Sequence, residues 1–233
     1  MSKKNNDKEF DEIGLVPELF DGKHQVIPII SGGDDVIEEV NLPEVLPILT
    51  LRSSVIFPGS VTPITVGRAK SIALVRAVEA GDGLLGAVLQ VDGSVEDPKP
   101  DDMHKIGTSA RILKILEMPN GNLTVILTGL EKIEVQEYIT TQPYFKATVT
   151  PIQDTTPDPK NVEFTAIVES IKEVALNIIN ISPTMPKEAA FAIKNLDSSR
   201  AIVNFICSNM DLTDDDRQYL LEAPGLLARS RRL

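Results

Sequence analysis

Residues 106–135 read IGTSARILKILEMPNGNLTVILTGLEKIEV. Two runs of β-prone residues, 106–118 and 123–135, flank the segment Pro-Asn-Gly-Asn at 119–122. Asn-Gly readily takes the positive backbone torsions that a tight hairpin turn needs. The stretch therefore predicts a long β-hairpin, with Leu123, Val125 and Leu127 on one face of its second arm.

Further β-prone runs lie on both sides of this hairpin, at 45–51, 61–66, 84–91 and 144–150. Pro47 and Pro63 fall inside the first two runs and predict edge strands or strand starts, because proline cannot donate a ladder hydrogen bond. Apolar residues at helical spacing predict one helix over 68–80, ended by Gly81. Six or so strands with one helix predict a twisted, partly closed β-barrel over residues 44–152.

A second region, residues 153–233, begins with the turn-forming segment 154–159 and then changes to helical periodicity. The apolar face that runs from Phe164 to Ile179 predicts a long amphipathic helix, which Pro183 and Pro186 end. Shorter helices are expected at 187–195, 198–208 and 213–222. A further helix-like run starts at 226, and we expect the chain to be truncated there. The fold class is therefore α+β, a β-barrel followed by a helical bundle.

Residues 1–43 are expected to form an acidic extension, with four lysines against ten Asp and Glu and a net charge of −6. Its apolar patches are too short to offset the entropy of ordering, although sequence leaves open whether it is ordered. The whole chain carries 23 Lys and Arg against 34 Asp and Glu, a formal charge of −11, and only 4% aromatic residues. Such a chain repels phosphate backbones and lacks stacking platforms, which argues against nucleic-acid binding.

The basic start of the chain is followed by no apolar signal-peptide core, and no run approaches the ~20 apolar residues that cross a bilayer. A single cysteine, Cys207, excludes an internal disulfide framework and lies in an apolar run, as a buried small hydrophobe does. These features predict a cytoplasmic protein without membrane contact.

No catalytic, cofactor-binding or metal-binding residue can be assigned. The string from Gly81 to Gly86 matches G-x-G-x-x-G, but a helix is expected before it and a strand after it, which is the reverse of a dinucleotide site. No P-loop, G-x-S-x-G or H-E-x-x-H motif occurs. One cysteine and two histidines, His24 and His104, are too few for a structural zinc site. The chain by itself is therefore not expected to be an enzyme.

One family becomes recognisable at residues 46–59, LPILTLRSSVIFPG. Together with the matching residues that follow, this string closely resembles the N-terminal domain of the Lon-type ATP-dependent proteases. Those residues are Pro63, Ile64, 66–68, Lys70, Ser71, Asp97, Pro98, 106–112, 119–121 and 129–132. Thr50 departs from the pattern, which usually has a second proline there. The match is looser beyond about 160 and does not include residues 1–43.

The resemblance implies a PUA-like β-barrel followed by a helical bundle, as the first part of a cytoplasmic homohexamer. It implies that the parent protein uses ATP and Mg²⁺ and carries a protease module with a Ser–Lys dyad, whose motifs are absent from this chain. The N-terminal region of the family engages unfolded or damaged proteins and supports assembly. Phe57, Pro58, Pro47 and Pro63 are the candidate substrate contacts, although Phe57 fits a core position equally well and Pro58 fits a turn.

Two alternatives stay open. The segment could mainly support oligomer assembly, which apolar surface left over on 164–179 or 226–233 would favour. It could also be a stand-alone adaptor or a PUA-like nucleic-acid-binding protein, if the reading frame ended at Leu233. Sequence does not give the substrates, the residues that touch them, or the number of subunits.

Overall fold

The structure is a computed structural model that describes residues 41–158, 160–182, 188–196 and 198–233. Most of the acidic extension predicted at 1–43, and the prolines 183 and 186, lie outside the described residues. The strands are β1 (Val45–Leu51), β2 (Val61–Val66), β3 (Leu84–Leu89), β4 (Ile106–Glu117), β5 (Leu123–Thr140) and β6 (Phe145–Ile152). The helices are α2 (Ala69–Glu79), the 3₁₀ turn η3 (Pro100–Asp102), α3 (Val162–Ile181), α4 (Glu188–Asn195), α5 (Ser199–Asn209), α6 (Asp214–Leu221) and α7 (Leu226–Arg232).

The predicted hairpin is confirmed and is the longest feature of the sheet. β4 and β5 pair in antiparallel register from Ile106 opposite Glu134 to Glu117 opposite Leu123. Gly121 closes the turn at φ +82°, a torsion that favours glycine. β5 runs five residues further than expected, to Thr140, and this extra length gives it a second strand to pair with.

β5 organises the barrel. One of its edges pairs with β4, and its other partners are β2 over Leu123–Thr128 and β6 over Lys132–Thr140. β1 lies between β3, with which it is parallel, and β6, with which it is antiparallel. The described strands thus close into a ring through β6, while β1 and β2 are not paired with each other. The predicted partly closed barrel is therefore confirmed, and its gap lies between β1 and β2.

The two strand prolines differ in position. Pro63 stands opposite Ile126 on β2, which is the last strand of the sheet order, so the predicted edge strand is confirmed there. For Pro47 the edge-strand alternative is wrong, because β1 has neighbours on both sides, whereas the strand-start alternative fits its place as the third residue of β1. Pro47 is tolerated as the third residue of β1, opposite Lys146, because the parallel ladder to β3 begins only at Ile48.

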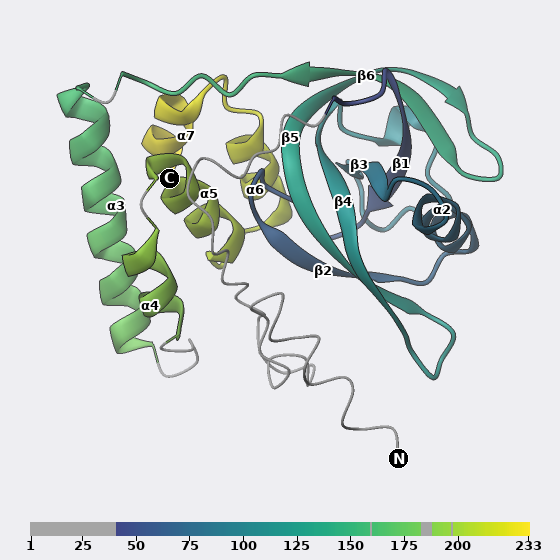
Figure 1. Ribbon diagram of the computed structural model, residues 1–233, viewed down its shortest axis with the longest axis horizontal. Coiled ribbons are helices and arrows are strands. Elements are labelled where there is room, and N and C mark those ends of the chain that lie inside the picture. The colour runs from purple at the N-terminus through teal and green to yellow at the C-terminus, as the bar shows by residue number, and fades with distance from the viewer. Residues whose placement is uncertain (1–40, 159, 183–187, 197) are drawn as a thin grey trace.

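The helices cover the barrel at two places (Figure 1). α2 connects β2 to β3 and buries Leu74, Val75 and Val78 against the barrel. The helices predicted beyond residue 160 are present within about two residues of their expected bounds, and α5, α6 and α7 lie between α3 and the barrel. None of the described helices combines the length and the apolarity that crossing a membrane requires.

The barrel and the helices share one hydrophobic core. A single cluster of buried side chains runs from Phe57 and Leu127 of the barrel region to Phe164, Val203 and Leu226 of the helices. A second cluster, which includes Leu46, Ile133 and Phe145, lies within the barrel. The two regions therefore pack as one body.

Buried charges lie at the junction between the two regions. Arg229 of α7 is fully buried, and its Nη1 contacts Asp154 Oδ2 at 2.5 Å and donates to Asn204 Oδ1 at 2.8 Å. Lys132 of β5 reaches the same carboxylate at 3.4 Å and donates to the carbonyl oxygen of Ala223 at 2.7 Å. One carboxylate therefore connects a strand of the barrel with the last helix.

Candidate functional site

Two adjoining hollows open beside the gap in the barrel. The first hollow has a volume of about 330 Å³ and lies between β1, the start of α2, the 96–98 segment and the start of β6. The second hollow has a volume of about 540 Å³ and lies between the second half of β1 with the residues after it and β2. Thr50, Arg68, Ser71 and Glu96 line both, so the two hollows form one continuous depression.

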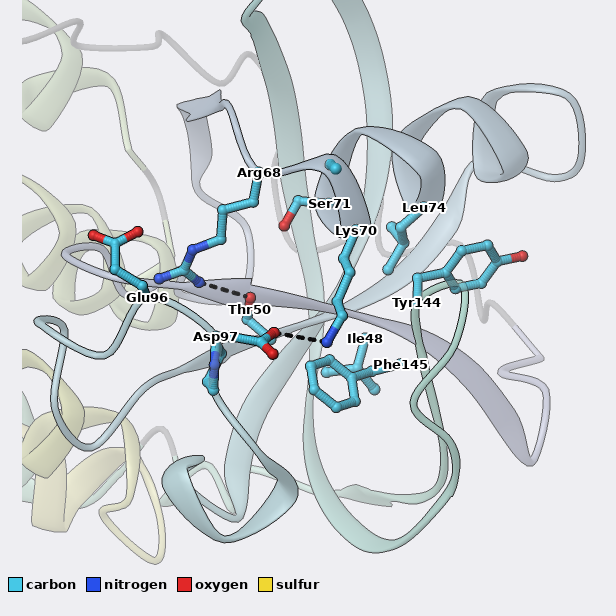
Figure 2. A pocket seen from close by; sticks show the side chains of 12 residues that line it. Ile48, Thr50, Arg68, Lys70, Ser71, Leu74, Glu96, Asp97, Tyr144 and Phe145 are labelled. Atoms are coloured by element: carbon cyan, nitrogen blue, oxygen red, sulfur yellow. Dashed lines mark hydrogen bonds and ion pairs between the residues drawn. The ribbon is translucent and has the colours of Figure 1, made fainter.

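The first hollow has an apolar floor and a polar rim, as Figure 2 shows. Ile48 and Phe145 come from two paired strands, Leu74 comes from α2, and Tyr144 precedes β6. The alternation of a strand explains this floor, because Ile48 and Thr50 are two residues apart and share one face of β1. The space is large enough for one large apolar side chain.

The second hollow borders strand edges that no described strand pairs with. From Leu49 onward β1 pairs with β3 but not with β6, and β2 pairs with β5 alone among the described strands. Leu49–Leu51 and Pro63–Val66 both line this hollow. Unpaired strand edges carry backbone donors and acceptors that an added strand can use.

Arg68 lies where the two hollows meet. Its Nη1 donates to Gln90 Oε1 at 2.5 Å and to Thr50 Oγ1 at 3.3 Å, and its Nη2 donates to the Val95 carbonyl oxygen at 3.0 Å. Burial, followed by repulsion from Arg52, lowers the pKa of the Arg68 guanidinium. Arg68 is therefore a fixed part of the lining that the two hollows share, tied to Thr50 of β1, to Gln90 after β3 and to the loop at Val95.

Two exposed ion pairs cross the rim. Arg52 Nη2 lies 2.6 Å from Glu96 Oε2, and Lys70 Nζ lies 2.7 Å from Asp97 Oδ1. The hydrogen bond from each cation lowers the pKa of its carboxylate partner. Lys70 Nζ also lies 5.6 Å from the centroid of the Phe145 ring, within range of a cation–π contact.

The four candidate contacts predicted from the sequence are not all at this surface. Phe57 and Pro58 are buried, because the loop after β1 packs closely against β5. A Cβ added at Gly129 would lie 2.3 Å from the Phe57 carbonyl oxygen, so only glycine leaves room for this loop. Asn204 Nδ2 donates to the Pro58 carbonyl oxygen at 2.9 Å and ties the loop to α5. The structure thus places both residues in the core.

Pro63 and Pro47 are half-buried, and the structure brings one of them to the site. Pro63 lines the second hollow on the edge strand β2. Pro47 lies next to Ile48 but does not line either hollow. Of the four candidates, Pro63 is the one whose position fits a contact with a bound segment.

The residues that sequence reasoning missed are Arg68, Lys70 and Asp97, together with Tyr144 and Phe145. The first three belong to the string that carried the family resemblance, yet they lie up to 29 positions apart and come from different segments. These residues come together because β1 pairs with β6 and because α2 packs beside these strands. No local sequence pattern shows either arrangement. The available signal was that two basic residues, Arg68 and Lys70, and one acidic residue, Asp97, all lie at positions that match the family pattern.

Two further features of the described residues concern possible metal ligands and the glycine-rich string. No three His, Cys, Asp or Glu side chains among them are arranged to share an ion. The string from Gly81 to Gly86 lies as predicted, with α2 before it and β3 after it, and Gly81 N–H donates to the Val78 carbonyl oxygen at 3.0 Å as part of the helix end. The helix presents its negative end to these glycines, which disfavours phosphate.

Comparison with known proteins gives consistent matches. The family model of the ATP-dependent protease La (LON) substrate-binding domain matches residues 45–233. The chain is 46% identical to the Lon protease of Flavobacterium johnsoniae over 91% of its own length and 26% of that protein. It is 37% identical to the Lon protease of Cytophaga hutchinsonii over 88% of its length and 25% of that protein. The chain thus spans about a quarter of the curated relatives it matches.

Solved structures show the same fold. The N-terminal domain of a Lon protease from the Mycobacterium avium complex superposes with a TM-score of 0.65, at 20% identity, over 80% of this chain and 94% of that one. A Lon N-terminal domain protein from Xanthomonas campestris gives a TM-score of 0.56, at 19% identity, over 81% of this chain and 95% of that one. At these identities the likeness concerns the fold alone.

Proposed function

Because the chain belongs to the family of the ATP-dependent protease La (LON) substrate-binding domain, we propose that it engages unfolded or damaged proteins and performs no chemistry itself. The observation that carries this proposal is the continuous depression formed by the two hollows. Its second hollow offers unpaired strand edges, and its first hollow offers an apolar floor. An unfolded chain presents extended backbone and uncovered apolar side chains along its whole length, whereas a native protein buries most of both.

The proposed mode of binding is a short extended segment that lies along the edge of β1 or β2. Its backbone pairs with the strand edge in the second hollow, and one large apolar side chain enters the first hollow. Backbone pairing gives little sequence preference, and a pocket for one side chain gives a moderate one. Such a site suits a protein that takes many substrates.

A substitution at Ser71 tests this mode, since Ser71 is buried and lines both hollows. Ser71→Leu places a larger side chain in the depression, and Ala77→Leu, at an exposed position of the same helix, is the matched control. Binding of a fluorescently labelled model protein, in unfolded and native forms, is measured by anisotropy, with circular dichroism to check folding. We expect wild type and A77L to bind the unfolded form and S71L to bind it at least about tenfold more weakly. Equal or absent binding of the two forms by wild type would sink the proposal.

We also propose that the segment supports self-association of the larger protein. Val174, Ile178 and Ile181 are exposed large apolar side chains along one side of α3, which is the leftover surface that favours assembly. Sedimentation velocity at several concentrations would show association for wild type and a loss of it for Ile178→Glu. A strict monomer at all concentrations contradicts this role.

For the whole protein we propose an ATP-dependent serine protease of the cytoplasm, assembled as a homohexamer and using ATP and Mg²⁺ in its other modules. The support is the match to Lon proteases that are about four times longer than this chain. Its substrates would be the unfolded or damaged proteins that this segment binds.

A further inference from the structure

We infer that Thr50 anchors the bound segment. Its backbone N–H and C=O exchange two hydrogen bonds with one residue of an antiparallel segment, and the side chain of that residue enters the first hollow. The inference rests on the proposed function, since it concerns the same depression. It names the strand edge that is used and the residue that sets the register of the bound segment.

Hydrogen bonds at the two ends of β1 show which way its backbone groups point. The Val149 N–H donates to the Glu44 carbonyl oxygen at 2.9 Å, so Glu44 faces β6. The Gln90 N–H donates to the Leu51 carbonyl oxygen at 2.8 Å, so Leu51 faces β3. Successive residues of a strand direct their backbone groups to opposite sides. The even-numbered residues of β1 therefore face the β6 side, and the odd-numbered residues face β3.

Thr50 faces the β6 side at a point that β6 does not reach. β6 pairs with β1 up to Ile48, which stands opposite Phe145, and no other described strand continues along that edge. The N–H and C=O of Thr50 thus point toward the depression, which Thr50 itself lines. An antiparallel segment placed there extends the β1–β6 ladder by one hydrogen-bonded pair.

The residue that pairs with Thr50 also places its side chain in the first hollow. Residues directly opposite each other in an antiparallel pair have their side chains on the same face. Ile48, Thr50 and Phe145 all line the first hollow, and Figure 2 shows Ile48 and Phe145 together at its floor. The side chain opposite Thr50 therefore stands next to Phe145, over the apolar floor. One residue of the segment makes both the backbone contact and the side-chain contact.

The edge of β2 is less suited to this pairing. The Gly129 N–H donates to the Ser60 carbonyl oxygen at 2.8 Å, so Ser60 and every second residue after it face β5. Val61, Pro63 and Thr65 therefore face the free side of β2, and Pro63, in the middle, has no N–H to donate. A segment along β2 would have a carbonyl oxygen without a donor at its centre, which is costly where water is excluded.

Substitutions at Thr50 separate the role of its backbone from that of its side chain. Thr50→Pro removes the N–H, and the fold should accept it because the family pattern usually has a proline at this position. Thr50→Val keeps the N–H and removes the hydroxyl that accepts a hydrogen bond from Arg68. Val61→Pro is the matched control, because it removes a free-side N–H from β2 at a residue that lines neither hollow.

The probe is a reduced, carboxymethylated and fluorescently labelled model protein, and its affinity for the 1–233 chain is measured by anisotropy. T50P should bind it about tenfold or more weakly than wild type, because a carbonyl oxygen of the bound segment loses its donor. T50V should bind much more tightly than T50P, since valine keeps the N–H. V61P should stay within about twofold of wild type, because the start of an edge strand tolerates proline. The anchor is thus a property of this chain and not of the family pattern, since a proline at position 50 has no N–H.

Hydrogen exchange provides a test that needs no substitution. In wild type the Thr50 amide, which no described strand pairs on its β6 side, should exchange more slowly when the unlabelled probe is bound. The Val61 and Thr65 amides on the free side of β2 should keep their rates. Exchange is followed residue by residue by NMR.

Other outcomes overturn the inference in distinguishable ways. If wild type binds the probe but T50P binds it equally well, or T50V loses as much affinity as T50P, the anchor is wrong while the proposed function stands. Protection of Val61 and Thr65 instead of Thr50 would place the segment on β2 and would also refute the anchor. If wild type does not bind the unfolded probe, the proposed function fails and the anchor fails with it. Urea unfolding of each variant confirms that the comparison is between folded proteins.

Discussion

At the scale of single residues, the most consequential group is the Asp154 carboxylate. It is shared by the buried side chains of Arg229 and Lys132, so two cations face one anion at the junction of barrel and helices. Charges in the interior are tolerated only when they are paired. The junction is therefore sensitive to any change at Asp154.

Asp154→Asn should lower the free energy of unfolding by about 3–5 kcal/mol, because it leaves two buried cations without their counter-charge. Urea titration followed by circular dichroism measures the change. Glu163→Gln breaks an exposed pair with Arg231 and should change the free energy of unfolding by no more than about 0.5 kcal/mol. Equal effects of the two variants would show that burial of the junction is not what makes Asp154 important.

Lys132 should make stability depend on alkaline pH. Burial lowers the pKa of its ammonium group from the ordinary value of 10.5, and attraction to Asp154 only partly opposes this. Between the lowered pKa and 10.5 the unfolded chain binds more protons than the folded chain, so the free energy of unfolding rises with pH. Wild type should therefore gain stability relative to Lys132→Met as pH increases toward 10.5. Urea titrations at several alkaline pH values check this, and parallel profiles would refute it.

Residue identity alone predicted some of these roles and missed others. Cys207 is buried as its apolar surroundings indicated, and its burial raises the pKa of the thiol to about 12. Arg229, in contrast, stands in a basic stretch beside Arg231 and Arg232, where solvated charge is the ordinary expectation. Its burial depends on Asp154, which lies 75 positions earlier, and no local pattern connects the two.

At the scale of elements, α3 depends on the residue that precedes it. Asn161 is the N-cap, and its Oδ1 accepts a hydrogen bond from the Phe164 N–H at 2.9 Å. Asn161→Ala should lower the free energy of unfolding by about 1 kcal/mol, since it leaves a helix N–H without its acceptor. Asn161→Ser keeps a capping oxygen and should stay close to wild type. Urea titration of both variants tests the cap, and equal losses would exclude it.

The elements themselves were largely predictable, whereas their arrangement was not. Alternation and Asn-Gly identified the hairpin, and helical spacing identified α2 and α3, because these signals are local. The pairing of β1 with both β3 and β6 joins segments that are 38 and about 100 positions apart, and hydrophobic alternation does not name a partner. The candidate site lies where these long-range pairings end, so it could not be located from the sequence.

At the scale of the whole molecule, the shared core predicts a single unfolding transition. Two local probes can test it, since the chain has no tryptophan and three tyrosines. In Tyr219→Phe the remaining tyrosines, Tyr138 and Tyr144, report on the barrel by fluorescence, and labelling of the buried Cys207 reports on α5. The two midpoints in urea should coincide. Separate midpoints would show that residues 44–152 and 153–233 unfold as independent domains.

The double pairing of β1 has a consequence for mechanical load. β1 is held by perpendicular antiparallel bonds to β6 and by slanted parallel bonds to β3, so tension applied along β1 from residues 41–44 shears both ladders rather than peeling one bond at a time. β2, held by β5 alone among the described strands, would instead peel away from one end. A force that enters at the amino-terminal side therefore meets a strand anchored on both flanks, and the gap beside it keeps its shape under traction.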